Sequence, residues 1–251
     1  MNWRSMLLVL SALAAAMLVT LPLIKPNFLV GVIYLAAHLA DTMFHECGHA
    51  IFAWTMGHPA IPSILTLVGS GQASGVALMF DHSWIAQICA WAAMAYGCWR
   101  LWQGESRLLA MLAAAVSLAL FALSFWYHNP VIWLYMGHGS SLLMGGFFLY
   151  RGLLDLSARS AFERWLNLFL GLFLLLDNGR FAWRLAFDDD ARDDYSSITL
   201  FGASHHDFMA MSDEWFRLSV KGIAQFTVGY AIAIVLVTLA LAYLRRNDYE
   251  A

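Results

Sequence analysis

Charged residues are scarce in this chain. Only 12% of its 251 residues are Asp, Glu, Lys or Arg, whereas 61% are hydrophobic. A soluble domain carries about 25% charged residues, so the composition argues against a soluble globular protein. It predicts an integral membrane protein, whose spanning helices each need about 20 mainly apolar residues.

Lysine and cysteine are also rare. Lys25 and Lys221 are the two lysines, and the formal net charge of −3 leaves no basic surface for nucleic acid. The three cysteines, an odd number in apolar surroundings, give no disulfide framework. No internal repeat or low-complexity linker interrupts the chain, so we expect residues 1–251 to form a single integral membrane domain.

Long apolar runs divide the chain into segments. Seven of them are long enough to predict transmembrane helices, which would make the fold an all-α polytopic membrane protein. The predicted spans cover residues 6–24, 28–56, 84–102, 107–127, 130–150, 165–187 and 220–244.

Two of the connections between these runs are unusual. After the second run, the short apolar segments 63–68 and 75–80 flank the sequence GSGQAS, a pattern typical of a β-hairpin. The hairpin is too apolar for an ordinary surface loop, so we expect it to be re-entrant or interfacial. The connection between residues 186 and 218 holds a run of aspartates and the triplet His205-His206-Asp207, and is expected to be a polar loop.

The second apolar run contains an H-E-x-x-H motif, His45-Glu46-Cys47-Gly48-His49. Residues four apart share one face of a helix, so both imidazoles can bind one zinc ion. Glu46 can then serve as the general base that activates a water molecule. The alternative is two packed histidines satisfied by their neighbours, with Glu46 paired to one of them. Ionisable groups in an apolar span are costly, which favours the metal site.

This motif carries a family resemblance. The sequence FHECGHAIFAWTMG, followed by a glycine-containing hairpin, resembles the site-2 protease family of intramembrane zinc metalloproteases, peptidase family M50. That family pairs H-E-x-x-H with an L-D-G whose Asp completes the zinc site. Here the sequence 176–179 is Leu-Asp-Asn-Gly, with one residue inserted before the glycine. The resemblance implies a zinc endopeptidase with Glu46 as catalytic base and Asp177 as third ligand. It also implies a membrane-embedded or juxtamembrane protein substrate.

The third ligand could come from any of three segments of the chain. If all seven runs span the membrane, the second and sixth helices run in the same direction, which places His49 and Asp177 about 12–15 Å below one surface. His138 in the fifth run reaches a similar depth, and Asp207 could fold over the site from its connection. Both remain alternatives to Asp177, which could instead form an ion pair with Arg180.

Several roles follow from this reading. His138 or Asn178 is expected to stabilise the oxyanion, and the hairpin is expected to present an extended substrate by strand addition. His38, about two turns deeper than His45, is expected to be a packing or supporting residue. The short chain suggests a multi-pass protein of a bacterial inner membrane.

Two other functions remain open. A Ste24-like membrane metalloprotease would need a glutamate ligand on a later helix, but the later glutamates lie at helix ends or in loops. A non-catalytic metal-binding or transport protein, or an inactive protease relative, would have no use for Glu46 beside its first histidine.

Overall fold

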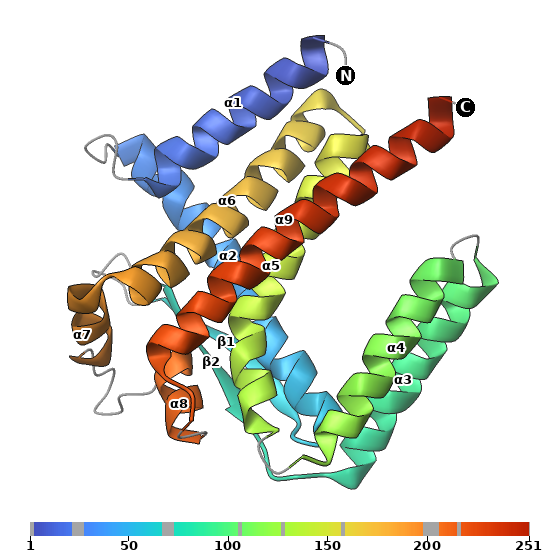
Figure 1. Cartoon of the computed structure of the whole chain (residues 1–251), viewed down its shortest axis with the longest axis vertical. Coiled ribbons are helices and arrows are strands. Elements are labelled where there is room, and N and C mark those ends of the chain that lie inside the picture. Colours follow the sequence, from blue (N-terminus) through green and yellow to red (C-terminus); the bar gives the residue numbers. More distant parts are fainter. Residues whose placement is uncertain are drawn as a thin grey trace.

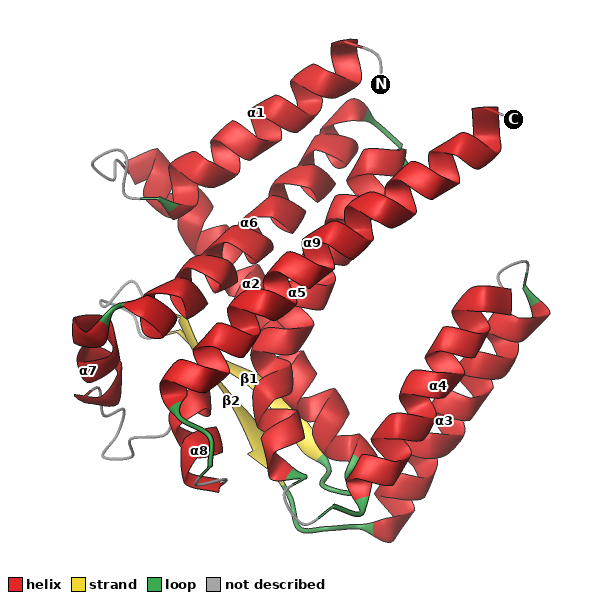
Figure 2. Cartoon of the chain, viewed as in Figure 1, coloured by secondary structure: helices red, strands yellow, loops and turns green. Residues whose placement is uncertain are grey.

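The computed structural model describes residues 3–21, 28–66, 73–104, 107–126, 129–156, 159–197, 206–214 and 217–250. Within these ranges the chain forms nine α-helices and one two-stranded β-hairpin (Figures 1 and 2). For the described residues, the prediction of a helical fold with a single hairpin is therefore confirmed.

Each of the seven predicted apolar runs forms a helix. The helices are α1 (Trp3–Thr20), α2 (Phe28–Thr55), α3 (Trp84–Gln103), α4 (Arg107–Ser124), α5 (Pro130–Leu154), α6 (Ala161–Phe187) and α9 (Val220–Glu250). The connection that we expected to be a polar loop contains two short helices, α7 (Asp189–Ser197) and α8 (Asp207–Glu214). Asp188 accepts a hydrogen bond from the Ala191 amide and so caps the start of α7.

The prediction of seven membrane spans is not confirmed. Among the described residues, two helical segments are long and apolar enough to cross a membrane, α2 and Val220–Arg245 of α9. The apolar stretches Ser5–Thr20 in α1 and Ala110–Ser124 in α4 have fewer than 18 residues. Helix α6 has sufficient length, but Asp177 and Arg180 lower the hydropathy of its apolar run.

Helices α5 and α6 form an antiparallel pair at the centre of the fold. Helix α6 begins after Ser160, whose hydroxyl accepts a hydrogen bond from the Glu163 amide at 3.2 Å. Helix α9 packs on both helices, running alongside α6, and α1 packs on α6 (Figure 1). The core between these helices includes the fully buried side chains of Leu142, Leu168, Phe173 and Leu174. The α3–α4 pair stands apart from this bundle (Figure 1).

Helix α2 approaches α5 closely because glycines lie at their crossing. A Cβ atom at Gly48 would overlap the Met136 carbonyl oxygen of α5. A Cβ atom at Gly137 of α5 would lie 2.7 Å from His45 Nε2 and would also overlap His49 Nε2. The backbone of α5 therefore lies directly against the histidine face of α2.

The β-hairpin follows α2 directly and packs along it. Its strands are β1 (Ala60–Thr66) and β2 (Ala73–Met79), paired antiparallel from Ala60↔Met79 to Thr66↔Ala73. The Trp54 indole donates a hydrogen bond to the Ala60 carbonyl at 2.9 Å and so ties the hairpin to the end of α2. The hairpin prediction is confirmed, although most of the predicted turn lies outside the described residues.

Candidate metal centre

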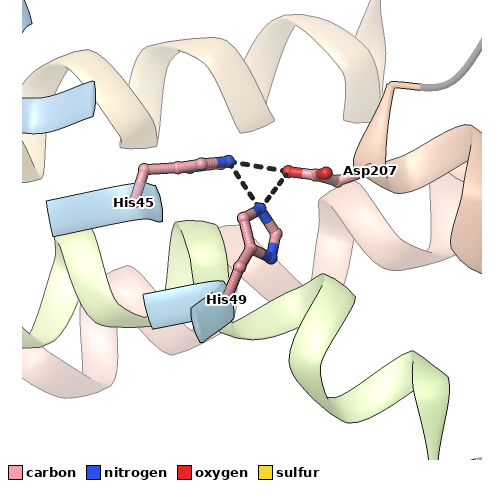
Figure 3. A group of neighbouring side chains, drawn as sticks. All are labelled: His45, His49 and Asp207. Atoms are coloured by element: carbon pink, nitrogen blue, oxygen red, sulfur yellow. Dashed lines mark hydrogen bonds and ion pairs between the residues drawn. The ribbon is translucent and has the colours of Figure 1, made fainter. Parts of the chain in front are cut away.

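His45 and His49 lie one turn apart on α2, and both imidazoles point to the same side of the helix (Figure 3). Their Nε2 atoms are 3.0 Å apart. The helical spacing alone would leave the rings free to point elsewhere, but the α5 backbone at Gly137 confines them. The expectation that the two histidines converge is therefore met.

Asp207, the first residue of α8, completes a tight group with these histidines (Figure 3). Its Oδ2 atom lies 2.8 Å from His45 Nε2 and 3.2 Å from His49 Nε2. The three ligand atoms all lie within 4.8 Å of one another. A zinc ion bonds to histidine nitrogens and carboxylate oxygens at about 2.0–2.2 Å, so a triangle with edges near 3 Å can hold one.

The hydrogen bonding of His49 supports a metal at this position. His49 Nδ1 lies 2.7 Å from the Trp133 carbonyl oxygen, which can only accept a hydrogen bond. In the neutral imidazole the proton is therefore on Nδ1, and Nε2 presents its lone pair to Asp207. A ring nitrogen that donates to a backbone carbonyl while the other faces the site is typical of metal-ligating histidines. The residues present thus fit a divalent cation.

The charge of Asp207 suits the same role. Burial by itself raises the pKa of the Asp207 carboxyl, but in the absence of metal the protonated forms of His49 and His45 outweigh it through their charge and hydrogen bonds. The pKa of Asp207 consequently lies well below its usual value. The carboxylate is ionised near neutral pH, which is the form that binds a metal.

Glu46 is buried beside this group. Only 3% of the residue is exposed, and its Oε2 atom has no hydrogen-bond partner among the described residues. It interacts electrostatically with His45, His49 and Asp207. A buried carboxylate oxygen without a partner is costly unless a proton, a water molecule or a substrate group satisfies it.

Asp177, the predicted third ligand, lies elsewhere. Its Oδ2 atom is 3.7 Å from His38 Nδ1, and together with Asp41 these residues form a second group of possible metal ligands. This corrects the depth estimate: α6 brings Asp177 level with His38, about two turns from His45. The alternative ion pair is not seen in the described part of the chain, where Arg180 donates a hydrogen bond to the Thr20 carbonyl.

The other candidates are placed as follows. His138 Nε2 lies 3.9 Å from Asp207 Oδ2, so the expectation that α5 reaches the site is met. Asn178 donates its amide hydrogens to Asp41 and to the Leu174 carbonyl, which leaves none for an oxyanion. His206 contacts Tyr195 with the two rings tilted and their centroids 4.6 Å apart, and His205 lies outside the described residues.

Two site features were missed or ranked low by sequence reasoning. Asp207 was only an alternative, although the His-His-Asp triplet in an otherwise mixed segment was a usable signal. Asp41 was not considered, although it lies four residues before His45 and therefore on the same helix face. The supporting carbonyl of Trp133 left no signal in the sequence.

Comparisons of the chain with protein-family models, with curated proteins and with solved structures gave no match. The case for a function accordingly rests on the residues of the site and on their geometry.

Proposed function

We propose that this protein is a zinc endopeptidase of the membrane, with His45, His49 and Asp207 as ligands and Glu46 as general base. The observation that carries the proposal is the convergence of the three ligand atoms within 4.8 Å, beside a buried glutamate whose Oε2 has no hydrogen-bond partner among the residues that the structure describes. The resemblance of the motif to the site-2 protease family supports the same activity. Asp207 takes the place that this resemblance gave to Asp177.

The chemistry follows from the donor set. A zinc ion held by His45, His49 and Asp207 would supply Lewis acidity. Glu46 Oε2, which has no hydrogen-bond partner among the described residues, would serve as the general base that takes a proton from water and returns it to the leaving amine. Trp133 holds His49 in the tautomer that keeps its Nε2 lone pair toward the site.

The membrane setting defines the substrate class. In both α2 and α9, only 17% of the most apolar window is buried within the protein, unlike the core helix of a soluble domain. Large side chains on α9 are exposed, among them Phe226, Ile232 and Leu236. These observations favour lipid contact, and we infer a multi-pass protein of a bacterial inner membrane that cleaves a membrane-embedded or juxtamembrane peptide bond.

The hairpin is suited to substrate presentation. It packs along α2, the helix that carries the motif, and contains two strands within the described residues. A two-stranded sheet has outer edges where an extended peptide can add as a further strand. Strand addition would hold the scissile segment unwound, as cleavage of a helical membrane peptide requires.

The test compares wild type with Glu46→Gln in detergent or liposomes, using a labelled transmembrane peptide library. Glu46→Gln keeps the size of the side chain but removes the base, so we expect zinc to be retained and cleavage to fall at least about 10²-fold. Cys47→Ser, the adjacent half-buried position, is the control and should cleave normally. Normal cleavage by Glu46→Gln would refute the assignment.

A second function is favoured by one observation. The group of His38, Asp41 and Asp177 lies one to two turns before His45 along α2, so two clusters of possible metal ligands follow one apolar helix. That series would suit a metal-transport protein. Metal flux into proteoliposomes, without any cleavage that depends on Glu46, would select transport over proteolysis.

A further inference from the structure

A chain of buried polar side chains runs from α2 through α6 to α5 beside the metal centre. It consists of Asp41, 7% exposed, Asn178, 4% exposed, and His138, whose side chain is 14% exposed. None of the three is needed by the proposed ligand set or by Glu46. A carboxylate on a predominantly apolar helix is costly, so Asp41 requires an explanation.

The orientation of the Asn178 amide is fixed by its surroundings. Its Nδ2 atom lies 3.1 Å from Asp41 Oδ1, from Asp41 Oδ2 and from the Leu174 carbonyl oxygen. All three are acceptors, so this position must hold the amide nitrogen. The amide oxygen Oδ1 consequently faces His138.

This orientation fixes the tautomer of His138 in turn. His138 Nδ1 lies 3.0 Å from Asn178 Oδ1, which can only accept a hydrogen bond. Nδ1 therefore carries the proton and donates it. The lone pair of the neutral imidazole is on Nε2, the atom that lies 3.9 Å from Asp207 Oδ2.

His138 thus repeats the arrangement found at His49. Both rings donate through Nδ1 to an oxygen outside the site and direct Nε2 toward Asp207. Three imidazole Nε2 atoms, of His45, His49 and His138, lie within 3.9 Å of a single carboxylate oxygen. His138 is the outlying one. It is not part of the group whose ligand atoms all lie within 4.8 Å of one another. Ligands of a tetrahedral zinc are about 3.3 Å apart, so the His138 ring must move toward the two other histidines when it binds the ion.

We propose that His138 is a fourth protein ligand of the metal in the substrate-free protein, held in its ligating tautomer by Asn178 and Asp41. This inference rests on the metal centre of the proposed function and extends it to a His₃Asp donor set. The Asp41 carboxylate then has a role: through the Asn178 amide it strengthens the His138 imidazole as a ligand. A substrate or water molecule must displace His138 or raise the coordination number to five.

The test is X-ray absorption at the zinc edge on purified, zinc-loaded protein, which counts imidazole ligands without any assay of cleavage. Wild type should show three imidazoles and His138→Phe two. Phenylalanine preserves the ring that stacks on Phe181 and contacts Phe208, so the variant is expected to fold. Asn178→Leu removes the tautomer lock and should raise the apparent Kd for zinc about 10–100-fold.

The outcomes separate this inference from the proposed activity. Two imidazoles in wild type would overturn the role of His138, whether or not Glu46-dependent cleavage is found. Three imidazoles without such cleavage would support His138 and refute the protease. A purified protein that binds no zinc would overturn both.

Discussion

Two clusters of ligand-type residues form along α2, each completed by a carboxylate from another helix, and they differ in how their side chains are supported. In the first, His45, His49 and Asp207 place ligand atoms 2.8–3.2 Å apart, and a backbone carbonyl orients His49. In the second, His38 Nδ1 lies 3.7 Å from Asp177 Oδ2, and this buried nitrogen has no hydrogen-bond partner in the described part of the chain. Similar residues on one helix therefore form a tight centre only where neighbouring groups fix the orientation of the ligand atoms.

The residues of the second cluster also make contacts with other side chains. Asp41 accepts two hydrogen bonds from Asn178, and His38 stacks on Tyr34 with ring centroids 5.4 Å apart. These contacts hold the residues where they are instead of directing them to a common point. We infer that the first cluster is the metal centre and that the second mainly supports it.

The largest difference between the clusters should appear when a histidine is removed. His45→Ala or His49→Ala deletes one of three converging ligands, and we expect the purified protein to lose its zinc. His38→Ala should keep about one zinc per chain, because its ring supports no tight group. Metal analysis by mass spectrometry measures both. Full zinc content in the His45→Ala, His49→Ala double variant would disprove the assignment.

The carboxylates give a second, smaller contrast. Asp207→Ala removes an oxygen that lies 2.8 Å from His45 Nε2. We expect the zinc Kd to rise more than about 100-fold, which exceeds the effect of losing a residue that only supports a ligand. Asp177→Ala should change the zinc Kd by less than about threefold. Competition with a fluorescent chelator provides both constants. If the two variants exchanged these behaviours, Asp177 would be the third ligand, as the family resemblance implied.

Two glycine substitutions test how strongly the α5 backbone determines the geometry of the first cluster. Gly137→Ala places a methyl group against His45 and His49, and overpacking of this kind costs about 1–3 kcal/mol. We expect a lower Tm and weaker zinc binding. Gly179→Ala on α6 is the matched control, since its Cβ meets nothing within 4 Å. Helical alanine is favoured there, so the control should be neutral or slightly stabilising. Equal thermal shifts in both variants would contradict the close packing.

The sequence was sufficient for the helices, the hairpin and the histidine pair, because each depends on local pattern. The apolar runs predicted α1–α6 and α9, and the i, i+4 spacing predicted that His45 and His49 share one helix face. Asp207 depends on how a connection of more than 30 residues folds back, which no local pattern encodes. The position of Asp177 beside His38 depends on how α6 packs along α2, which the depth of a residue within its span does not encode.

Because the third ligand lies far along the sequence from the other two, a bound metal would also affect the stability of the folded chain. His49 and Asp207 are separated by about 160 residues, so an ion held between them acts as a reversible cross-link across most of the protein. In the chain-entropy description used for disulfides, closing a loop of this size stabilises the folded state by about 5 kcal/mol. Helix α8 is short and carries its ligand at its first residue. Release of the ion would therefore remove this cross-link while Phe208 and Met211 keep α8 in the core, so the metal would contribute to the stability of the fold as well as to its chemistry.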